Sequence, residues 1–502
     1  MLRCSTPPNE TFGEVLSAGP PRLVQLRRRS ISDVVFQESR EQVRRMKRTL
    51  DLIRRLAPGP LLLLFALSAT GIWSTFGSAQ SIAFTNVRIV DGNGGAPVER
   101  GTIVIDGRKI VAVGPASSIS IPPGARSIDE SGKTAMPGLA DMHVHLTGGW
   151  DGVSADMLGY QRYMNALLYA GVTTVLDTGN VESYVLQLRA ETAAGRLLGP
   201  RIYCVGPLVD GPDPFWPELS RAVVSQDQVP GLVHQLVDEK VDLIKLYAGL
   251  SDLEIQAIST EAKKYKLRTI IDVHSRNGSI EPMLDGIAGW AHLPTRKLPD
   301  EAIATAKAKQ VFFITTLSVI ESFSWRRFQD MSFLDQPLIA DTTPSFALAD
   351  LRKLAREELN KRPPLTALLN AENNVKRLAQ AGILIAAGTD APYPGDFQGE
   401  GIHHELELLV ESGLTPLEAI TIATKNAAKI MNAETEWGTL EPGKLANVVI
   451  VDGKPDQNIS DTRKIVAIVK DGTILDRNKL KLDPAVDPGY RPIGGMEAPG
   501  TE

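Results

Sequence analysis

Residues 137–145 read PGLADMHVH, an apolar run that closes on two histidines separated by one residue. Side chains alternate between the two faces of a β-strand, so a strand here places His143 and His145 on the same face. Two imidazoles at that spacing can bind one divalent cation. The pair alone is weak evidence, because two histidines on a half-exposed strand give the same pattern. The rest of the chain therefore has to decide whether this is a metal site.

Four further residues that suit such a site end short apolar runs downstream. They are Lys245, His274, His292 and Asp390. Enough chain separates the runs for a helix or a long loop between them. If the runs are parallel strands of one barrel, their carboxyl ends meet where barrel enzymes carry their reacting groups. The pattern thus favours one metal site built from several strands.

Eight apolar runs alternate with helix-like patterns across the centre of the chain. This alternation predicts an α/β protein whose parallel strands close into a (β/α)₈ barrel of the TIM type. The runs lie at 137–146, 172–178, 201–206, 241–247, 268–275, 287–293, 311–317 and 383–390.

Short strands separated by turn residues fill both ends of the globular part. Asp91-Gly92 and Asp106-Gly107 are typical of hairpin turns in the first of these parts. The two parts can pair only if the middle of the chain folds back on itself. We therefore predict a small β-sandwich built from 80–136 and 438–478, flanking a barrel domain at 137–437.

The chain resembles the amidohydrolase superfamily, in its imidazolonepropionase-like and prolidase-like branch, which includes Xaa-Pro and Xaa-Arg dipeptidase-like enzymes. The resemblance runs from about Ile82 to about Leu475 and implies the same barrel. Two positions depart from the family pattern: Ser275 replaces the usual alanine, and Asn447 replaces the usual aspartate. Neither is an expected metal ligand. The matching segments are 137–145, 171–175 (GVTTV), the runs ending at Lys245, His274 and His292, 388–390 (GTD), 405–420 and 438–447.

The resemblance implies two divalent metal ions, for which zinc is the usual choice at histidine-rich sites. His143, His145 and Asp390 would bind the first ion, and His274 and His292 the second. An ammonium group cannot bind a metal, but a lysine amine that has reacted with carbon dioxide is an anionic carbamate with two oxygens. In the family a lysine on this strand bridges the ions in that form, which points to Lys245. A mononuclear site with unmodified Lys245, or a Lys245 that contacts substrate, stays open.

The same resemblance suggests the catalytic roles. A water bridging the ions would be acidified, and Asp390 would take its proton and later deliver it to the leaving nitrogen. Tyr247, two residues after Lys245 and so on the same side, is a candidate to stabilise the oxyanion or to bind substrate, with packing as the alternative. His403 and Arg276 are further candidate substrate-binding residues, and Arg221 and Arg296 are alternatives to Arg276.

Two long connections leave the predicted active-site end of the barrel, at 207–221 and 318–370. Long loops at such an end usually shape the substrate pocket. Helical packing on the outside of the barrel explains parts of the second segment equally well. The tail 479–502 is rich in proline and glycine and is expected to be extended.

The first 79 residues differ in composition from the rest. Residues 1–45 are a basic leader, and we expect translation to begin at Met46 instead. Residues 46–79 have a basic start, an apolar run from Leu61 to Trp73 and small residues before Gln80. This pattern predicts a signal peptide, with an uncleaved membrane anchor as the alternative, and hence an exported, periplasmic or secreted protein.

Composition limits the classes of function. The chain has 502 residues and a net charge of −5, without a basic stripe in the globular part. Binding to nucleic acid therefore has no electrostatic support. Only two cysteines occur, and Cys4 lies in the leader, so the mature domain cannot form an internal disulfide. The sequence leaves open whether the protein forms a homo-oligomer.

These features predict a metal-dependent hydrolase that cuts an amide C–N bond of a small molecule, namely a dipeptide or an N-acyl amino acid. The alternatives are a cyclic amidase or an ester or carbamate hydrolase that uses the same site. The pattern expected of deaminases in this superfamily is not apparent. A metal-free relative that only binds ligands is the remaining alternative, and occupation of all six ligand positions argues against it.

Overall fold

The computed structural model describes residues 80–152, 154–273, 286–361, 364–483 and 485. The predicted leader and signal segment, together with His274 and Arg276, lie outside the described residues. Among those that are described, no helix has the length and hydropathy needed to cross a membrane.

Both ends of the globular part contribute to one eight-stranded sheet, in the order β18-β17-β16-β5-β1-β2-β3 with β4 beside β1. Strand β5 pairs antiparallel with β16 and aligns Ala135 with Ile450, which confirms that the two terminal parts pair. The second layer of a β-sandwich stays a prediction. The strands are β1 (Ile82–Ile89), β2 (Val98–Asp106), β3 (Lys109–Pro115), β4 (Arg126–Asp129), β5 (Thr134–Pro137), β16 (Val448–Val451), β17 (Ile465–Lys470) and β18 (Thr473–Ile474).

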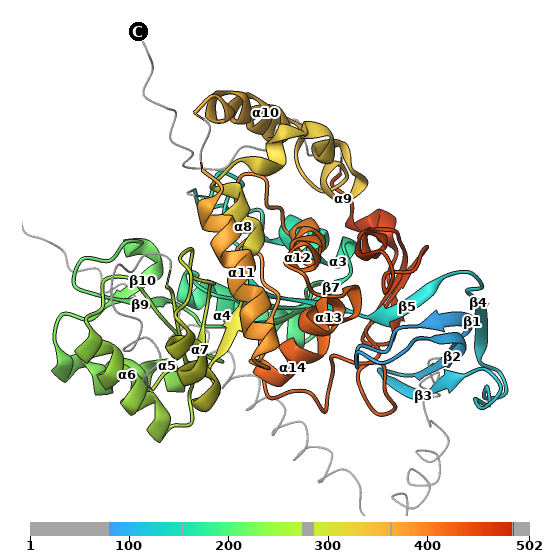
Figure 1. Ribbon diagram of the computed structural model, residues 1–502. Helices are drawn as coiled ribbons and strands as arrows, with labels where there is room; N and C mark the ends of the chain where they lie inside the picture. Colours follow the sequence, from blue (N-terminus) through green and yellow to red (C-terminus); the bar gives the residue numbers. More distant parts are fainter. Residues whose placement is uncertain (1–79, 153, 274–285, 362–363, 484, 486–502) are drawn as a thin grey trace, which may run out of the picture. The chain divides into compact units, whose positions relative to one another are not determined.

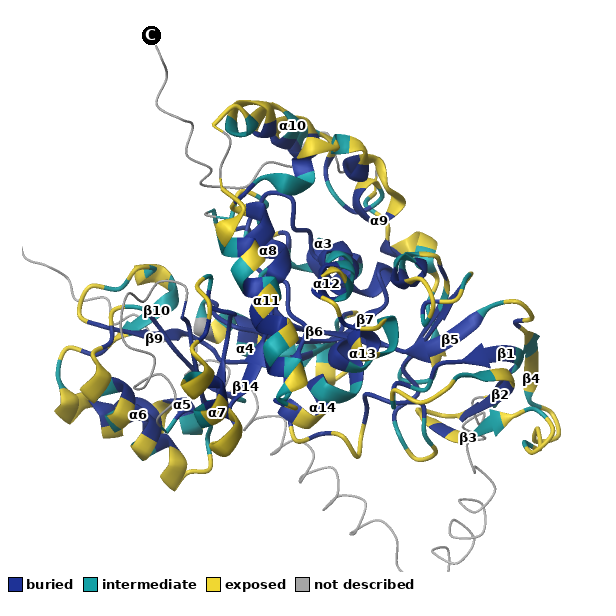
Figure 2. Cartoon of the chain, in the orientation of Figure 1, coloured by how far each residue is buried: buried dark blue, intermediate teal, exposed yellow. Residues whose placement is uncertain are grey.

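The centre of the chain forms two parallel sheets, one of three strands (β6-β7-β8) and one of seven (β10-β9-β11-β12-β13-β14-β15). Each of the eight predicted runs contains one of these strands. Most of them are buried along their whole length, as Figure 2 shows. The strands are β6 (Leu139–Val144), β7 (Val172–Asp177), β8 (Arg201–Cys204), β9 (Leu208–Asp210), β10 (Ser220–Ala222), β11 (Ile244–Leu246), β12 (Thr269–Ile271), β13 (Gly289–Trp290), β14 (Phe312–Ile314) and β15 (Ile385–Ala386).

Helices follow most of the parallel strands (Figure 1) and present one apolar face to them. In α6 the buried residues are Ile255, Ile258, Ser259 and Ala262, which recur at the helical period. The helices are α3 (Tyr160–Tyr169), α4 (Glu182–Ala193), α5 (Val229–Asp238), α6 (Asp252–Lys264), α7 (Asp300–Ala308), α8 (Leu317–Ser322), α9 (Pro337–Ala340), α10 (Ser345–Leu359), α11 (Thr366–Gln380), α12 (Glu400–Glu411), α13 (Pro416–Thr421) and α14 (Ala427–Ile430). Shorter turns are η2 (Pro217–Leu219), η3 (Gln226–Gln228), η5 (Arg326–Gln329), η6 (Met331–Asp335), η7 (Ile422–Asn426), η8 (Ile459–Arg463) and η9 (Arg477–Leu480).

The two long connections are more ordered than the sequence suggested. Segment 207–221 contributes β9 and β10, and β9 pairs with β11 beside Lys245. Segment 318–370 is largely helical and has a core of its own that includes Phe328, Phe333 and Leu351. Packing therefore accounts for most of its aromatic residues, whereas Phe323 is 44% exposed.

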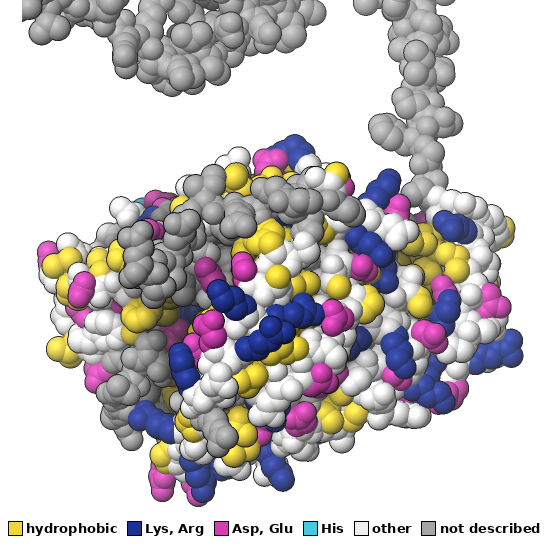
Figure 3. Space-filling view, turned by 90° about the horizontal axis from the view of Figure 1, so that it is seen from above, with side chains coloured by type: hydrophobic (Ala, Val, Ile, Leu, Met, Phe, Trp, Pro, Cys, Tyr) yellow, Lys and Arg dark blue, Asp and Glu magenta, His cyan; other side chains and the backbone are white. Residues whose placement is uncertain are grey.

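Charges of both signs alternate on the face of the molecule shown in Figure 3.

A buried ion-pair cluster connects helix α12 to the terminal sheet. Glu400, which is fully buried, accepts hydrogen bonds from Arg327 and from Arg463 of η8. Burial alone raises the pKa of Glu400, but the two guanidinium groups outweigh it and lower that pKa to about 2.

This cluster gives a pH-dependent stability. Because the folded-state pKa of Glu400 is about 2 and its ordinary value is 4.5, its ionised form contributes about 3 kcal/mol above pH 4.5. We expect that contribution to be lost as the pH falls from 4.5 towards 2. In Glu400→Gln, urea unfolding should show lower stability at pH 7 and a weaker further loss at pH 3.5. An equally steep acid loss in Glu400→Gln and in the surface control Glu358→Gln would contradict this assignment.

Candidate active site

The carboxyl ends of four parallel strands bring charged and imidazole side chains together. His143 lies on β6 and His145 follows it directly, while Lys245 lies on β11. His292 follows β13 by two residues, and Asp390 follows β15 by four. Five of the six predicted metal ligands thus converge, and the sixth, His274, lies outside the described residues.

Asp390 is the meeting point of the first pair of histidines. Its Oδ1 atom lies 3.1 Å from His143 Nε2 and 3.0 Å from His145 Nε2. One donor atom from each of these three residues falls within 4.8 Å of the others. This geometry makes the His-His-Asp set a possible metal site, with the three donors facing one point.

Lys245 and His292 stand on the other side of His143. Lys245 Nζ lies 3.1 Å from His143 Nε2, and the lysine side chain is 2% exposed. Asp272, which the sequence analysis missed, lies between them: its Oδ2 is 3.1 Å from His292 Nε2 and 3.8 Å from Lys245 Nζ. The signal that could have found it is an acidic residue inside an apolar run, two positions before His274 and hence on the same face.

Each described histidine of the site has its Nδ1 atom engaged away from the centre. His143 Nδ1 donates to Ala291 O (2.7 Å), and His145 Nδ1 donates to Gly179 O (2.8 Å). His292 Nδ1 lies 2.9 Å from Thr316 Oγ1. A carbonyl can only accept, so it fixes the Nδ1–H tautomer and leaves the Nε2 lone pair for a cation. This is the usual environment of metal-binding histidines.

The charge states also suit a cation. Burial alone raises the pKa of Asp390, but His143 and His292 outweigh it, and the pKa falls well below its usual range. Burial, together with the nearby Lys245, lowers the pKa of His143 well below its usual range. The lowered pKa keeps Asp390 ionised, which is the form that binds metal ions.

A second layer of hydrogen bonds holds this arrangement from behind. Buried Asp141 accepts from Thr389 N (3.0 Å), Thr389 Oγ1 (2.7 Å) and His143 N (3.2 Å). Asp390 has a positive φ of 74°, which is unusual for a residue other than glycine and is tolerated where the surroundings enforce it. A side chain would not fit at Gly388, because a Cβ there would lie 2.7 Å from His143 Cβ.

Two of the candidate substrate-binding residues, Tyr247 and His403, lie in different surroundings. Tyr247 is 9% exposed, its hydroxyl accepts a bond from Trp216 Nε1 (3.2 Å), and its ring centre lies 5.7 Å from Lys245 Nζ. His403 is fully buried, and its two ring nitrogens contact Thr462 Oγ1 and Ala170 O, both at 2.9 Å. No ring nitrogen of His403 is left to bind a substrate, so its position argues for a packing role.

Gly179 borders the site through its carbonyl, which bonds to His145, and the next residue, Asn180, lines a cavity of about 310 Å³. Arg221 lines the same cavity, and its guanidinium pairs with Glu239 at 2.8 Å. The predicted alternative Arg296 contributes its backbone carbonyl, which accepts a bond from Asn374.

Comparison with known proteins gives the family. The model of the amidohydrolase family matches residues 134–476. The chain belongs to this family. Among curated relatives, the imidazolonepropionase of Brevibacillus brevis is 23% identical over 379 residues, covering 70% of this chain and 83% of the relative. A 5-methylthioadenosine/S-adenosylhomocysteine deaminase of Symbiobacterium thermophilum is 22% identical over 388 residues, covering 71% and 81%.

Solved structures agree with this assignment. A putative prolidase from Bifidobacterium longum is 25% identical, with a TM-score of 0.64 over 79% of this chain and 94% of that one. The predicted family resemblance is thus confirmed. As a member of this family, whose relatives act on C–N bonds, the chain is an enzyme.

The geometry predicts how metal affinity depends on the His-His-Asp set. Outer-shell partners of a metal site typically change affinity about 10–100-fold, so loss of a direct donor in Asp390→Asn or His145→Ala should cost at least as much. Titration calorimetry with Zn²⁺ measures this. His234→Ala is the control, because His234 is exposed and contacts Asp238 and Tyr265 on the surface, neither of which belongs to the candidate site. Equal affinities in all four proteins would argue against the site.

Proposed function

We propose that the chain is a binuclear metal-dependent hydrolase that cuts the amide C–N bond of a dipeptide or an N-acyl amino acid. The observation that carries the proposal is the position of Asp390 Oδ1, about equally close to His143 Nε2 and His145 Nε2. Lys245 and His292 line the adjoining space. His143, His145 and ionised Asp390 offer donors for one cation, and Lys245, His292 and His274 would supply those of a second.

The residues divide between two ions. His143, His145 and Asp390 would hold the first, and His292 with His274 the second, with Lys245 as a carbamate between them. Zinc is the default for such donors. When bound, the ions would acidify a water molecule and polarise the substrate carbonyl.

The protein's own groups handle the proton. Asp390 is ionised and its side chain is 20% exposed, so it can accept a proton from the attacking water and return it to the leaving nitrogen. Tyr247 is held by its bond from Trp216 and stands on the Lys245 side. We assign it the role of stabilising the charge that develops on the carbonyl oxygen.

Several observations support a peptide-like substrate. The solved structures that resemble this chain include a putative prolidase and a Xaa-Pro dipeptidase. Phe215, 64% exposed, packs against Tyr247 and offers an apolar surface beside the site. An exported enzyme, as residues 46–79 suggest, would also meet peptides outside the cell. A cyclic amidase or an ester or carbamate hydrolase would use the same residues.

We further propose that the two parallel sheets close into a (β/α)₈ barrel around this site. Met142 N donates to Ala387 O at one junction, and Asp242 N donates to Cys204 O at the other, both at 2.9 Å. A parallel bridge between Val144 and Ala391 extends the first junction. These bonds support a ring in which β6 lies beside β15 and β8 lies beside β11, so that β6–β8 and β11–β15 would be its eight strands.

Activity can be tested with the mature protein from Gln80 onward, loaded with Zn²⁺. We expect release of amines from dipeptides or N-acyl amino acids, loss of turnover with a chelator, and about two ions per chain. Asp390→Asn should lower kcat by a factor of about 100 or more, because general acid–base catalysis typically contributes 10²–10⁴-fold. His234→Ala should retain normal turnover.

The other outcomes separate the alternatives. Two bound ions without turnover of any amide would exclude the peptidase assignment and favour esters, carbamates or lactones. Failure to bind metal at all would favour the metal-free binding relative. The N-terminal sequence of exported protein tests the predicted cleavage before Gln80, since a mature terminus upstream of Met46 would refute it.

A further inference from the structure

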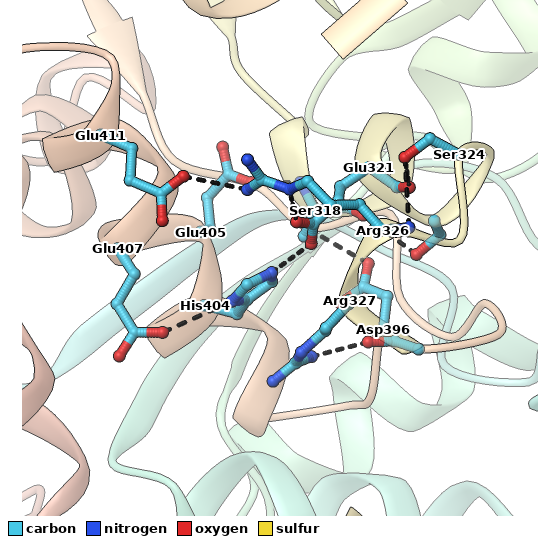
Figure 4. A network of polar contacts seen from close by, with 12 residues as sticks. Ser318, Glu321, Ser324, Arg326, Arg327, Asp396, His404, Glu405, Glu407 and Glu411 are labelled. Atoms are coloured by element: carbon cyan, nitrogen blue, oxygen red, sulfur yellow. Dashed lines mark hydrogen bonds and ion pairs between the residues drawn. The ribbon is translucent and has the colours of Figure 1, made fainter. Parts of the chain in front are cut away.

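The family segment 405–420 begins on helix α12 and continues into α13, and the catalytic scheme above assigns it no role. The first residue of this segment, Glu405, is fully buried. Figure 4 shows Glu405 among the polar residues of α12 and α8, near Ser318. Burial raises the pKa of Glu405 to about 7 despite hydrogen bonds that oppose the rise. A buried carboxylate of this kind is costly unless its bonds serve the structure around it.

Both carboxylate oxygens of Glu405 accept bonds from one turn, residues 315–318, which joins β14 to α8. Thr315 Oγ1 donates to Oε1, and Ser318 N donates to Oε2 at 2.8 Å. Between them, Thr316 adopts a left-handed backbone conformation with φ 51°. Threonine rarely adopts this conformation, so the turn needs external bonds to hold it.

This turn contacts the candidate metal site at two points. Thr316 Oγ1 lies 2.9 Å from Nδ1 of His292. Ser318 Oγ donates to the carbonyl of Thr389, the residue before Asp390, at 3.1 Å. One carboxylate on α12 thus connects through a single turn to His292 and to the loop that carries Asp390.

We propose that Glu405 is a positioning residue: by fixing the turn 315–318, it orients the imidazole of His292 with its Nε2 atom towards the centre. The assignment rests on the proposed function only in treating His292 as a metal ligand. Glu405 touches neither substrate nor metal donors, so it acts entirely through Thr315, Thr316 and Ser318.

The chemistry of the contacts makes a sharp variant available. Ser318 N can only donate, so a glutamine at this position would turn its carbonyl oxygen towards Ser318 and its NH₂ group towards Thr315 Oγ1. The Thr315 hydroxyl would then have to accept instead of donate, which leaves its hydrogen without the Glu405 acceptor. Glu405→Gln keeps the size of the side chain. Thr316→Val removes the hydroxyl next to His292 and keeps the branched shape. Both variants should disturb His292 without opening a cavity.

The first measurement is Zn²⁺ affinity and stoichiometry of the mature protein, by competition with a chromophoric chelator. Glu405→Gln and Thr316→Val should each weaken binding of the second ion about 10–100-fold, as outer-shell partners do, and leave the first ion largely unaffected. The double variant should lose no more than Thr316→Val alone, because the residues act in one chain of contacts. Additive losses would overturn the proposal.

Glu407→Gln is the matched control. Glu407 lies on the same helix and bonds to Arg463, Ser460 and His404 instead of to the turn. Its loss should lower thermal stability without changing affinity for the second ion. If Glu407→Gln weakened that ion as much as Glu405→Gln does, the effect would be general destabilisation and the proposal would fail.

A second readout needs no metal and separates this proposal from the proposed function. Long-range ¹H–¹⁵N correlation spectra of the metal-free, histidine-labelled protein report which ring nitrogen of His292 carries the proton. Asp272 Oδ2 can only accept from His292 Nε2, whereas Thr316 Oγ1 can donate to Nδ1. In the metal-free wild type we therefore expect the Nε2–H form, and in Glu405→Gln a mixture of the two forms. Unchanged spectra would overturn the positioning role even if two ions bind. Changed spectra in a protein that binds fewer than two ions would sustain it and refute the binuclear centre instead.

Discussion

The rest of the site depends on the contacts that the imidazole of His143 makes. The side chain is fully buried and uses both ring nitrogens: Nδ1 donates to Ala291 after β13, and Nε2 faces Lys245 of β11 and Asp390 after β15. Its carbonyl accepts from Asp390 N. One residue on β6 therefore fixes the spacing of three other strand ends.

Such a centre is held in place by its surroundings. A buried imidazole and a buried carboxylate are stable together only when every remaining polar atom has a partner. Asp141 supplies acceptors to the Asp390 loop, and the turn at 315–318 supplies a contact to His292. These supporting residues come from β6 and from the turn after β14, so the polar layer behind the site binds the strands to one another.

Much of the architecture could be predicted from the sequence, because local periodicity carries that information. The alternation of apolar runs with helix-like patterns identified the eight strands and placed His143, Lys245 and His292 near their ends. The supporting contacts could not be predicted in this way. Glu405 lies 90 residues from Thr315, and Asp272 became recognisable only when its neighbours Lys245 and His292 were in place. The direction of the His403 ring could not be predicted either, because helix α12 turns it towards Ala170 and Thr462.

The ion pair between Arg463 and Glu400 can form only late in the synthesis of the chain. Its partners are separated by 63 residues. At about 5–20 residues per second, a ribosome needs roughly 3–12 s to make that stretch. During this interval α12 lacks one of the two guanidinium groups that neutralise Glu400. Strand β5 likewise lacks its partner β16. Helix α12 therefore gains its full set of ion pairs only after the terminal segment has been made, so the catalytic part and the terminal sheet complete their folding together.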